Sequence, residues 1–222
     1  MANQDRANGF QYHSSMNAGG GMAPPMQHLP LATTNEPLGL GDLVSLTAAG
    51  TVDRTCTDGG GDHQENSGVG VFQGIRYMNA AGELVEGSYC PGAQGDDTNV
   101  LTAGSGGIVS FLPLTPQTIW SVQCDDGGAV AISQTLVGNA QDPLAVEATD
   151  PTQLGPSGRS NMELDMDLPG AASTGPSMFH IVGLDEKPGR VFGTTEADSR
   201  FGRVLVVVAD ALWGITPTAT GI

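Results

Sequence analysis

Apolar residues in this chain occur in short, strand-length runs, and Gly, Pro, Asp or Asn separates one run from the next. Gly occurs 33 times and Pro 14 times in 222 residues, and no long amphipathic helical period is visible. Such punctuation breaks helices but leaves room for strands of about four to eight residues. The sequence therefore predicts an all-β protein, an antiparallel β-barrel or sandwich of jelly-roll-like type, with long Gly/Pro-rich loops.

The predicted strands form a body over residues 38–222. A hairpin is expected where residues 69–78 and 84–89 flank the short turn at residues 79–82, and a second where residues 108–114 and 118–124 flank Thr115-Pro116. The loop-like stretch at 138–158 leaves open a division into two β subdomains. The other predicted strands are residues 40–46, 129–136, 162–168, 178–184 and 203–209.

Residues 1–37 differ from the body, because they combine Gly19-Gly20-Gly21 and Pro24-Pro25 with no persistent period. This composition predicts an extended N-terminal arm, with a disordered tail as the alternative. An arm of this kind could insert apolar side chains into a partner. The candidates for such partner contacts are Phe10, Tyr12, Met26, Leu29 and Leu31.

Charge excludes some partners. The chain has 24 acidic and 8 basic side chains, a net charge of −16, and Lys187 is its only lysine. Binding to nucleic acid or to an anionic membrane draws on clustered Lys and Arg, so neither partner is expected. No secretory leader and no membrane-spanning apolar run is visible. A salty habitat or a biased genome is an alternative cause of the acidity.

Residues 162–168 alternate cleanly, with Glu163, Asp165 and Asp167 on one predicted face and four apolar residues on the other. The three carboxylates are candidate contacts for a basic partner, and a solvated strand face is the alternative.

Reactive chemistry is sparse. Asp58, Asp62, His63 and Glu65 share a loop, but three consecutive Gly favour a floppy loop over a metal site. His180 sits in an apolar strand and is expected to be a core residue. The three cysteines are too scattered for a disulfide framework, so buried, reduced thiols are expected. We predict no catalytic residue, cofactor or metal, and no enzyme.

Several segments, in order, resemble a family of tailed-bacteriophage head proteins. The start MANQDRANGF is similar to the family's MAN…NGF opening. The end, HIVGLDEKPGRVFG followed by RVLVVVADALWG, is similar to its closing hairpin. The internal matches are GDLV (Gly41 to Val44), GVFQGIRY (Gly70 to Tyr77) and WSVQCDDGG (Trp120 to Gly128).

These relatives are capsid decoration, or cement, proteins. The resemblance implies a β-rich body on the outer capsid surface of the virion, bound to the major capsid protein and stabilising contacts between its subunits. It also implies a homo-oligomer, with a trimer favoured over a dimer, and no catalytic residues to carry over.

Two other functions remain open. One is another virion β module, such as a head fibre, a tail component or a carbohydrate-binding domain. An exposed Trp120 or Trp213 beside a polar groove would indicate sugar binding. The other is a hydrolase whose active-site residues are dispersed along the chain.

Overall fold

The computed structural model describes residues 8–16, 23–32, 37–54, 68–79, 81–90, 107–125, 132–141, 143–145, 159–164, 178–186, 192 and 201–208. These residues form strands and one short 3₁₀ helix, and all strand pairs between named strands are antiparallel. The all-β antiparallel prediction is confirmed. Over the described part of the chain, no helix is long and apolar enough to cross a bilayer.

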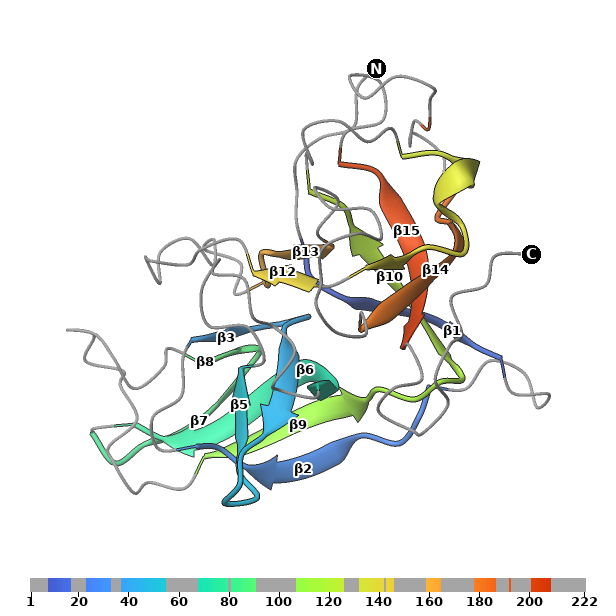
Figure 1. The fold of residues 1–222 in the computed structure, drawn as a ribbon. Coiled ribbons are helices and arrows are strands. Elements are labelled where there is room, and N and C mark those ends of the chain that lie inside the picture. The colour runs from blue at the N-terminus through green and yellow to red at the C-terminus, as the bar shows by residue number, and fades with distance from the viewer. Residues whose placement is uncertain are drawn as a thin grey trace.

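One main sheet has five strands in the order β1-β10-β15-β14-β11 (Figure 1). It joins the two ends of the described chain, because β10 pairs with β1 on one side and with β15 on the other. Its strands are β1 (Gln11–Ser15), β10 (Thr118–Gln123), β15 (Arg203–Val208), β14 (Phe179–Leu184) and β11 (Ala140–Gln141).

The other main sheet has the order β2-β9-β6-β4-β5, and β7 pairs with the second half of β6. A parallel bridge between Leu31 and Val52 links the end of β2 to β5, so the sheet curls towards itself without closing into a barrel. Its strands are β2 (Gln27–Pro30), β4 (Leu43–Leu46), β5 (Val52–Arg54), β6 (Gly68–Met78), β7 (Leu84–Gly87) and β9 (Ile108–Pro113).

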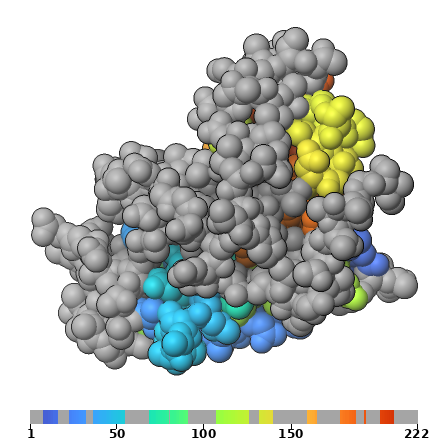
Figure 2. Space-filling model, viewed as in Figure 1, coloured from blue at the N-terminus to red at the C-terminus, as the bar shows by residue number. Residues whose placement is uncertain are grey.

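Two short ladders and the 3₁₀ helix complete the description. Strand β3 (Leu38–Gly39) pairs with β8 (Tyr89–Cys90), and β12 (Pro143–Ala145) pairs with β13 (Met162–Leu164). The helix, η1, spans Gln134–Leu136. Figure 2 shows β2, β4 and β5 (blue and cyan) at the surface at the bottom of the view. The segment that includes η1 (yellow) lies at the surface at the upper right.

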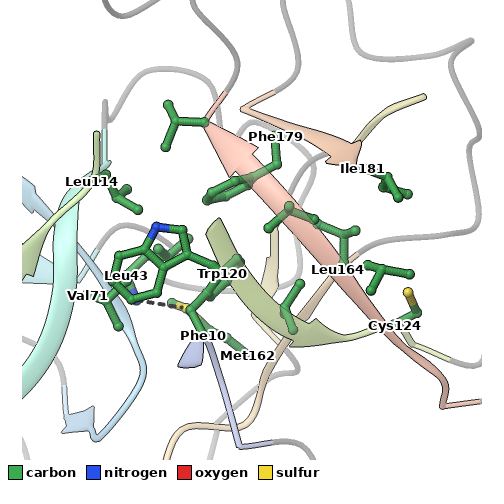
Figure 3. Close-up of a cluster of buried hydrophobic side chains, with 14 of the residues drawn as sticks. Phe10, Leu43, Val71, Leu114, Trp120, Cys124, Met162, Leu164, Phe179 and Ile181 are labelled. Atoms are coloured by element: carbon green, nitrogen blue, oxygen red, sulfur yellow. Dashed lines mark hydrogen bonds between the residues drawn. The ribbon is translucent and has the colours of Figure 1, made fainter. Parts of the chain in front are cut away.

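The first core lies between the two sheets (Figure 3). Leu43 and Val71 from the six-stranded sheet face Trp120 from the five-stranded one, and the Leu43 amide donates a hydrogen bond to Met162 Sδ at 3.2 Å. Phe10 is 1% exposed, and its ring stacks on Phe179 with centroids 4.8 Å apart.

The second core fills the inside of the curled six-stranded sheet. The residues that follow Leu43 and Val71 in the chain, Val44 and Phe72, point into this core. Because successive side chains of a strand point to opposite faces, β4 and β6 line both cores at once. The other buried members are Leu31, Leu38, Val52, Ile75, Tyr77, Cys90, Val109 and Phe111.

The prediction of a separate arm over residues 1–37 is wrong for the described parts of that range. Strand β1 pairs with β10 along Gln11–Ser15, and β2 pairs with β9 along Gln27–Pro30. Because these backbone groups complete both sheets, the segment belongs to the body. The subdomain boundary near 138–158 falls largely outside the described residues.

The hairpin predicted around Thr115-Pro116 is also wrong. The Thr118 amide bonds to the Thr115 carbonyl at 3.0 Å, so the chain does turn. However, β9 pairs with β2 and β6, whereas β10 pairs with β1 and β15. The turn therefore carries the chain from one sheet to the other.

The structure confirms both of the other predicted hairpins but not the strand predicted at residues 129–136. Strands β6 and β7 form the expected hairpin, in which Gly82 takes a φ of +81° that favours glycine. Strands β14 and β15 pair as the closing hairpin. In the predicted strand at 129–136, however, the described residues 132–136 contain no strand, and Gln134–Leu136 form η1.

Candidate functional site

A buried polar cluster ties the five-stranded sheet to the start of the described chain. The Arg203 guanidinium donates to Ser121 Oγ at 3.0 Å, to the Ser121 carbonyl at 2.7 Å and to the Gly9 carbonyl at 3.3 Å. Ser121 Oγ donates in turn to Asp185. All three side chains are buried, so the serine is held as a structural hydrogen-bond partner.

A second buried cluster surrounds Asp42. Its carboxylate accepts hydrogen bonds from the Gly39 amide at 2.6 Å and from Ser160 Oγ, and it forms an ion pair with Arg54 at 3.4 Å. Both partners of the ion pair are at most 1% exposed. A buried pair of this kind costs desolvation, which the hydrogen bonds to Asp42 and the bond from Arg54 Nη2 to Asn161 Oδ1, at 3.2 Å, offset in part. Among the described residues, Arg54 Nε has no hydrogen-bond partner. The cluster fixes the loop that links β3 to β4.

The predicted row of carboxylates is not a surface feature where the structure describes it. Glu163 is 4% exposed and accepts a hydrogen bond from Gln123 Nε2, so it is not free for a basic partner. The reason is that β13 lies against the end of β10, where Cys124 bridges to Leu164 and both faces of β13 are covered. Asp165 and Asp167 lie outside the described residues.

The apolar candidates from the first 37 residues have different surroundings. Phe10 lies in the first core and Leu31 in the second, so the prediction that they contact a partner is wrong in this fold. Tyr12 and Leu29 are half-buried against the two cores, and the Tyr12 ring meets Trp120 edge-on at 6.1 Å. Met26, at 47% exposed, remains accessible.

The outer face of the six-stranded sheet brings together side chains that sequence reasoning did not group. Leu29, Ile75 and Val109 point inward, so their neighbours along β2, β6 and β9 point outward. The register places His28 beside Ser110 and Ser110 beside Gly74. It also places Ile108 beside Arg76, Arg76 beside Glu86, and Met78 beside Leu84. We call this surface the outer face, made of Met26, His28, Gly74, Arg76, Met78, Leu84, Glu86, Ile108 and Ser110.

An open groove of about 460 Å³ crosses the outer face. Gly74 and Gly87 both line it, and their backbones lie close together, because a Cβ added at Gly74 would lie 3.1 Å from the Gly87 carbonyl oxygen. The groove is flanked by the Arg76–Glu86 ion pair on one side and by the His28–Ser110 hydrogen bond, at 2.9 Å, on the other. Such a groove can accept a side chain or a short loop of another protein.

Chemically reactive groups are not gathered on this face. Among the described residues, no three His, Cys, Asp or Glu side chains form a group that could hold a metal ion. The expected burial is confirmed for Cys90 and Cys124, which are both fully buried. Burial raises the pKa of the Cys124 thiol far above its ordinary value, and the nearby carboxylates of Asp125 and Glu163 raise it further. A thiol held protonated in this way is a poor nucleophile.

Other predicted site residues have definite positions. His180 is half-buried, because it points away from the first core while its neighbours Phe179 and Ile181 point into it. Trp120 is fully buried and cannot stack on a sugar. Trp213, Cys56 and the acidic loop at 58–65 lie outside the described residues.

One pattern in the sequence does indicate the outer face. In GVFQGIRYM the apolar residues Ile75 and Tyr77 alternate with Arg76 and Met78, which is typical of a strand with one solvent-exposed face. No family model, curated protein or solved structure matches the chain.

Proposed function

We propose that the chain is a capsid decoration protein that binds the outer surface of a phage head and stabilises contacts between major capsid subunits. The observation that carries the proposal is where the resembling segments fall. Gly41 to Val44 and Gly70 to Tyr77 contribute β4 and β6, which line both cores, and Trp120 is central to the first core. The resemblance thus follows the framework of the body.

The physics of the role agrees with the charge and the fold. A packaged genome pushes a shell outward, and a cement protein resists the separation of neighbouring subunits. A stiff two-core β body transmits such a load better than a flexible chain, because packed interiors have low compressibility. A protein outside the shell needs no DNA-binding charge, which agrees with a net charge of −16.

Oligomerisation is part of the proposal. A homo-oligomer, with a trimer favoured, would present several copies of one docking surface to a symmetric lattice. Contacts that are individually modest then combine through effective concentration. The proposed protein is not an enzyme, and its partner is the major capsid protein.

The experiment compares heads assembled with and without the protein. Heads lacking it should release their DNA at a lower temperature and after a milder osmotic shock, and adding the purified protein should restore resistance. Equal resistance with and without the protein would contradict the proposal. Turnover of a small molecule by the isolated chain would do the same.

A further inference from the structure

We infer that the outer face of the six-stranded sheet is the surface that docks onto the shell, with its groove receiving an apolar side chain of a shell subunit. This inference rests on the proposed function and names the contact surface for it. Strands β2, β9, β6 and β7 support the face rigidly, because the side chains pointing the other way are packed in the second core.

Apolar exposure is concentrated on this face. Among the described residues, seven large apolar side chains are exposed, and four of them belong to it. Their exposed fractions are 47% for Met26, 39% for Met78, 63% for Leu84 and 44% for Ile108. Exposed apolar side chains interspersed with polar groups are typical of protein-binding surfaces.

The charge of the face also favours a protein contact. Arg76 and Glu86 form an ion pair across β6 and β7, so their charges cancel. Apart from His28, the face has no other ionisable side chain, and the net charge of −16 therefore resides elsewhere on the chain. A partner can approach this face without burying unpaired carboxylates, which would be costly.

The size of the face decides between possible occupants. Four strands spaced by about 4.8 Å, with about five residues each at about 3.3 Å per residue, give a footprint of roughly 300 Å². A stable pair of proteins buries about 800 Å² on each side. The face is therefore too small to hold a second copy of this chain by itself. It is large enough for a contact that an oligomer repeats across a lattice.

The residues that line the groove indicate which groups the shell subunit would place in it. Its lining includes the apolar side chains of Met26 and Ile108, which an apolar side chain of the partner would contact. Beside it, His28 and Ser110 offer hydrogen-bonding groups, and the ion pair offers a charged donor and acceptor. The fitting partner is a folded shell surface with one protruding apolar residue inside a polar rim.

The test is co-sedimentation of the full-length protein with heads that lack it. The double variant Met26→Ser/Ile108→Ser should bind at least tenfold more weakly than the parent, because about 1.5–3 kcal/mol is at stake for each buried apolar side chain. The matched control is Met16→Ser/Val182→Ser, whose side chains are 55% and 41% exposed and lie off this face. The control should bind like the parent.

The possible results distinguish a failure of the proposed docking surface from a failure of the proposed function. If the parent does not bind the heads, the proposed function fails. If the parent and both double variants bind equally tightly, the function stands and the outer face is the wrong surface. If Met26→Ser/Ile108→Ser leaves head binding intact but dissociates the oligomer, as measured by light scattering, the face joins copies of this chain and the inference is overturned. Circular dichroism confirms that each variant is folded.

Discussion

Phe10 is buried in the first core, although its neighbours in the sequence predicted an exposed position in an arm. Polar and small residues surround Phe10 in the sequence, and this composition predicted an extended arm. In the fold, Gly9 adopts a φ of +61° and an added Cβ there would lie 2.5 Å from the Gly41 carbonyl oxygen. Only glycine allows the chain to pass so close, and this passage places Phe10 in the first core. Sequence patterns cannot reveal a partner as distant as Phe179.

Replacing Phe10 by Ala should therefore destabilise the whole protein. The loss of a buried ring that stacks on Phe179 is expected to lower the free energy of unfolding by about 3–5 kcal/mol. The control Met26→Ala, at an exposed position, should change it by no more than about 0.5 kcal/mol. Urea denaturation gives both values, and similar small changes would show that Phe10 is not packed.

Cys124 predicts how stability depends on pH. Its folded-state pKa is raised above the ordinary value of 9.0, so the folded protein holds this proton when the unfolded chain has released it. The stabilisation is complete below about pH 9 and is lost as pH rises further, by at most about 1.4 kcal/mol per pH unit.

Denaturation midpoints at pH 8 and pH 10 measure this effect. The parent should lose more stability over this interval than Cys124→Ala, because the variant lacks the titrating thiol. Other titrating groups are the same in both proteins and cancel in the difference. Parallel losses in the two proteins would show that the thiol ionises normally in the folded state.

At the level of elements, the sequence predicted strand pairs that are close together in the chain and missed pairs that are far apart. The β6–β7 and β14–β15 hairpins were predicted because an apolar alternation and a turn lie next to each other in the chain. The pairings of β1 with β10 and of β2 with β9 join residues about 80 to 110 positions apart, and no local signal specifies them. For the same reason, a true turn at Thr115 was mistaken for a hairpin.

The first 37 residues therefore have a testable structural role. Deleting residues 1–37 removes β1, β2 and the buried side chains of Phe10, Leu31 and Ala32. We expect the truncated protein to lose cooperative unfolding and native-like protection of its amides from hydrogen exchange. A truncated chain with an unchanged urea midpoint would show instead that these residues form an independent arm. The comparison also matters for function, because weaker head binding by the truncated chain would follow from unfolding alone.

At the scale of the whole molecule, two cores share the same strands. Leu43 and Val71 face one core, while Val44 and Phe72 face the other. The candidate face could not be predicted for a related reason. Which side of β6 meets solvent depends on how the sheet curls, and that curl is set by bulges and by the Leu31–Val52 bridge between distant residues.

Shared strands should make unfolding a single event. Leu43→Ala and Val44→Ala are each expected to shift one common urea transition to lower concentration. The free energy of unfolding should fall by about 2–5 kcal/mol, or somewhat less for the smaller valine. In a Trp213→Phe background, fluorescence then reports Trp120 in the first core, and far-ultraviolet circular dichroism reports both sheets. The two transitions should coincide. Separate midpoints would show two independently folding units.

The placement of β1 has a consequence during synthesis on the ribosome. Residues 27–113 contain every strand of the six-stranded sheet, so this half can assemble while the chain is still growing. The five-stranded sheet cannot, because β10 must wait for β15, which emerges almost two hundred residues after Gln11. Phe10 has no ring to stack on until Phe179 emerges about 170 residues later, so the nascent chain exposes its earliest aromatic residue for most of translation.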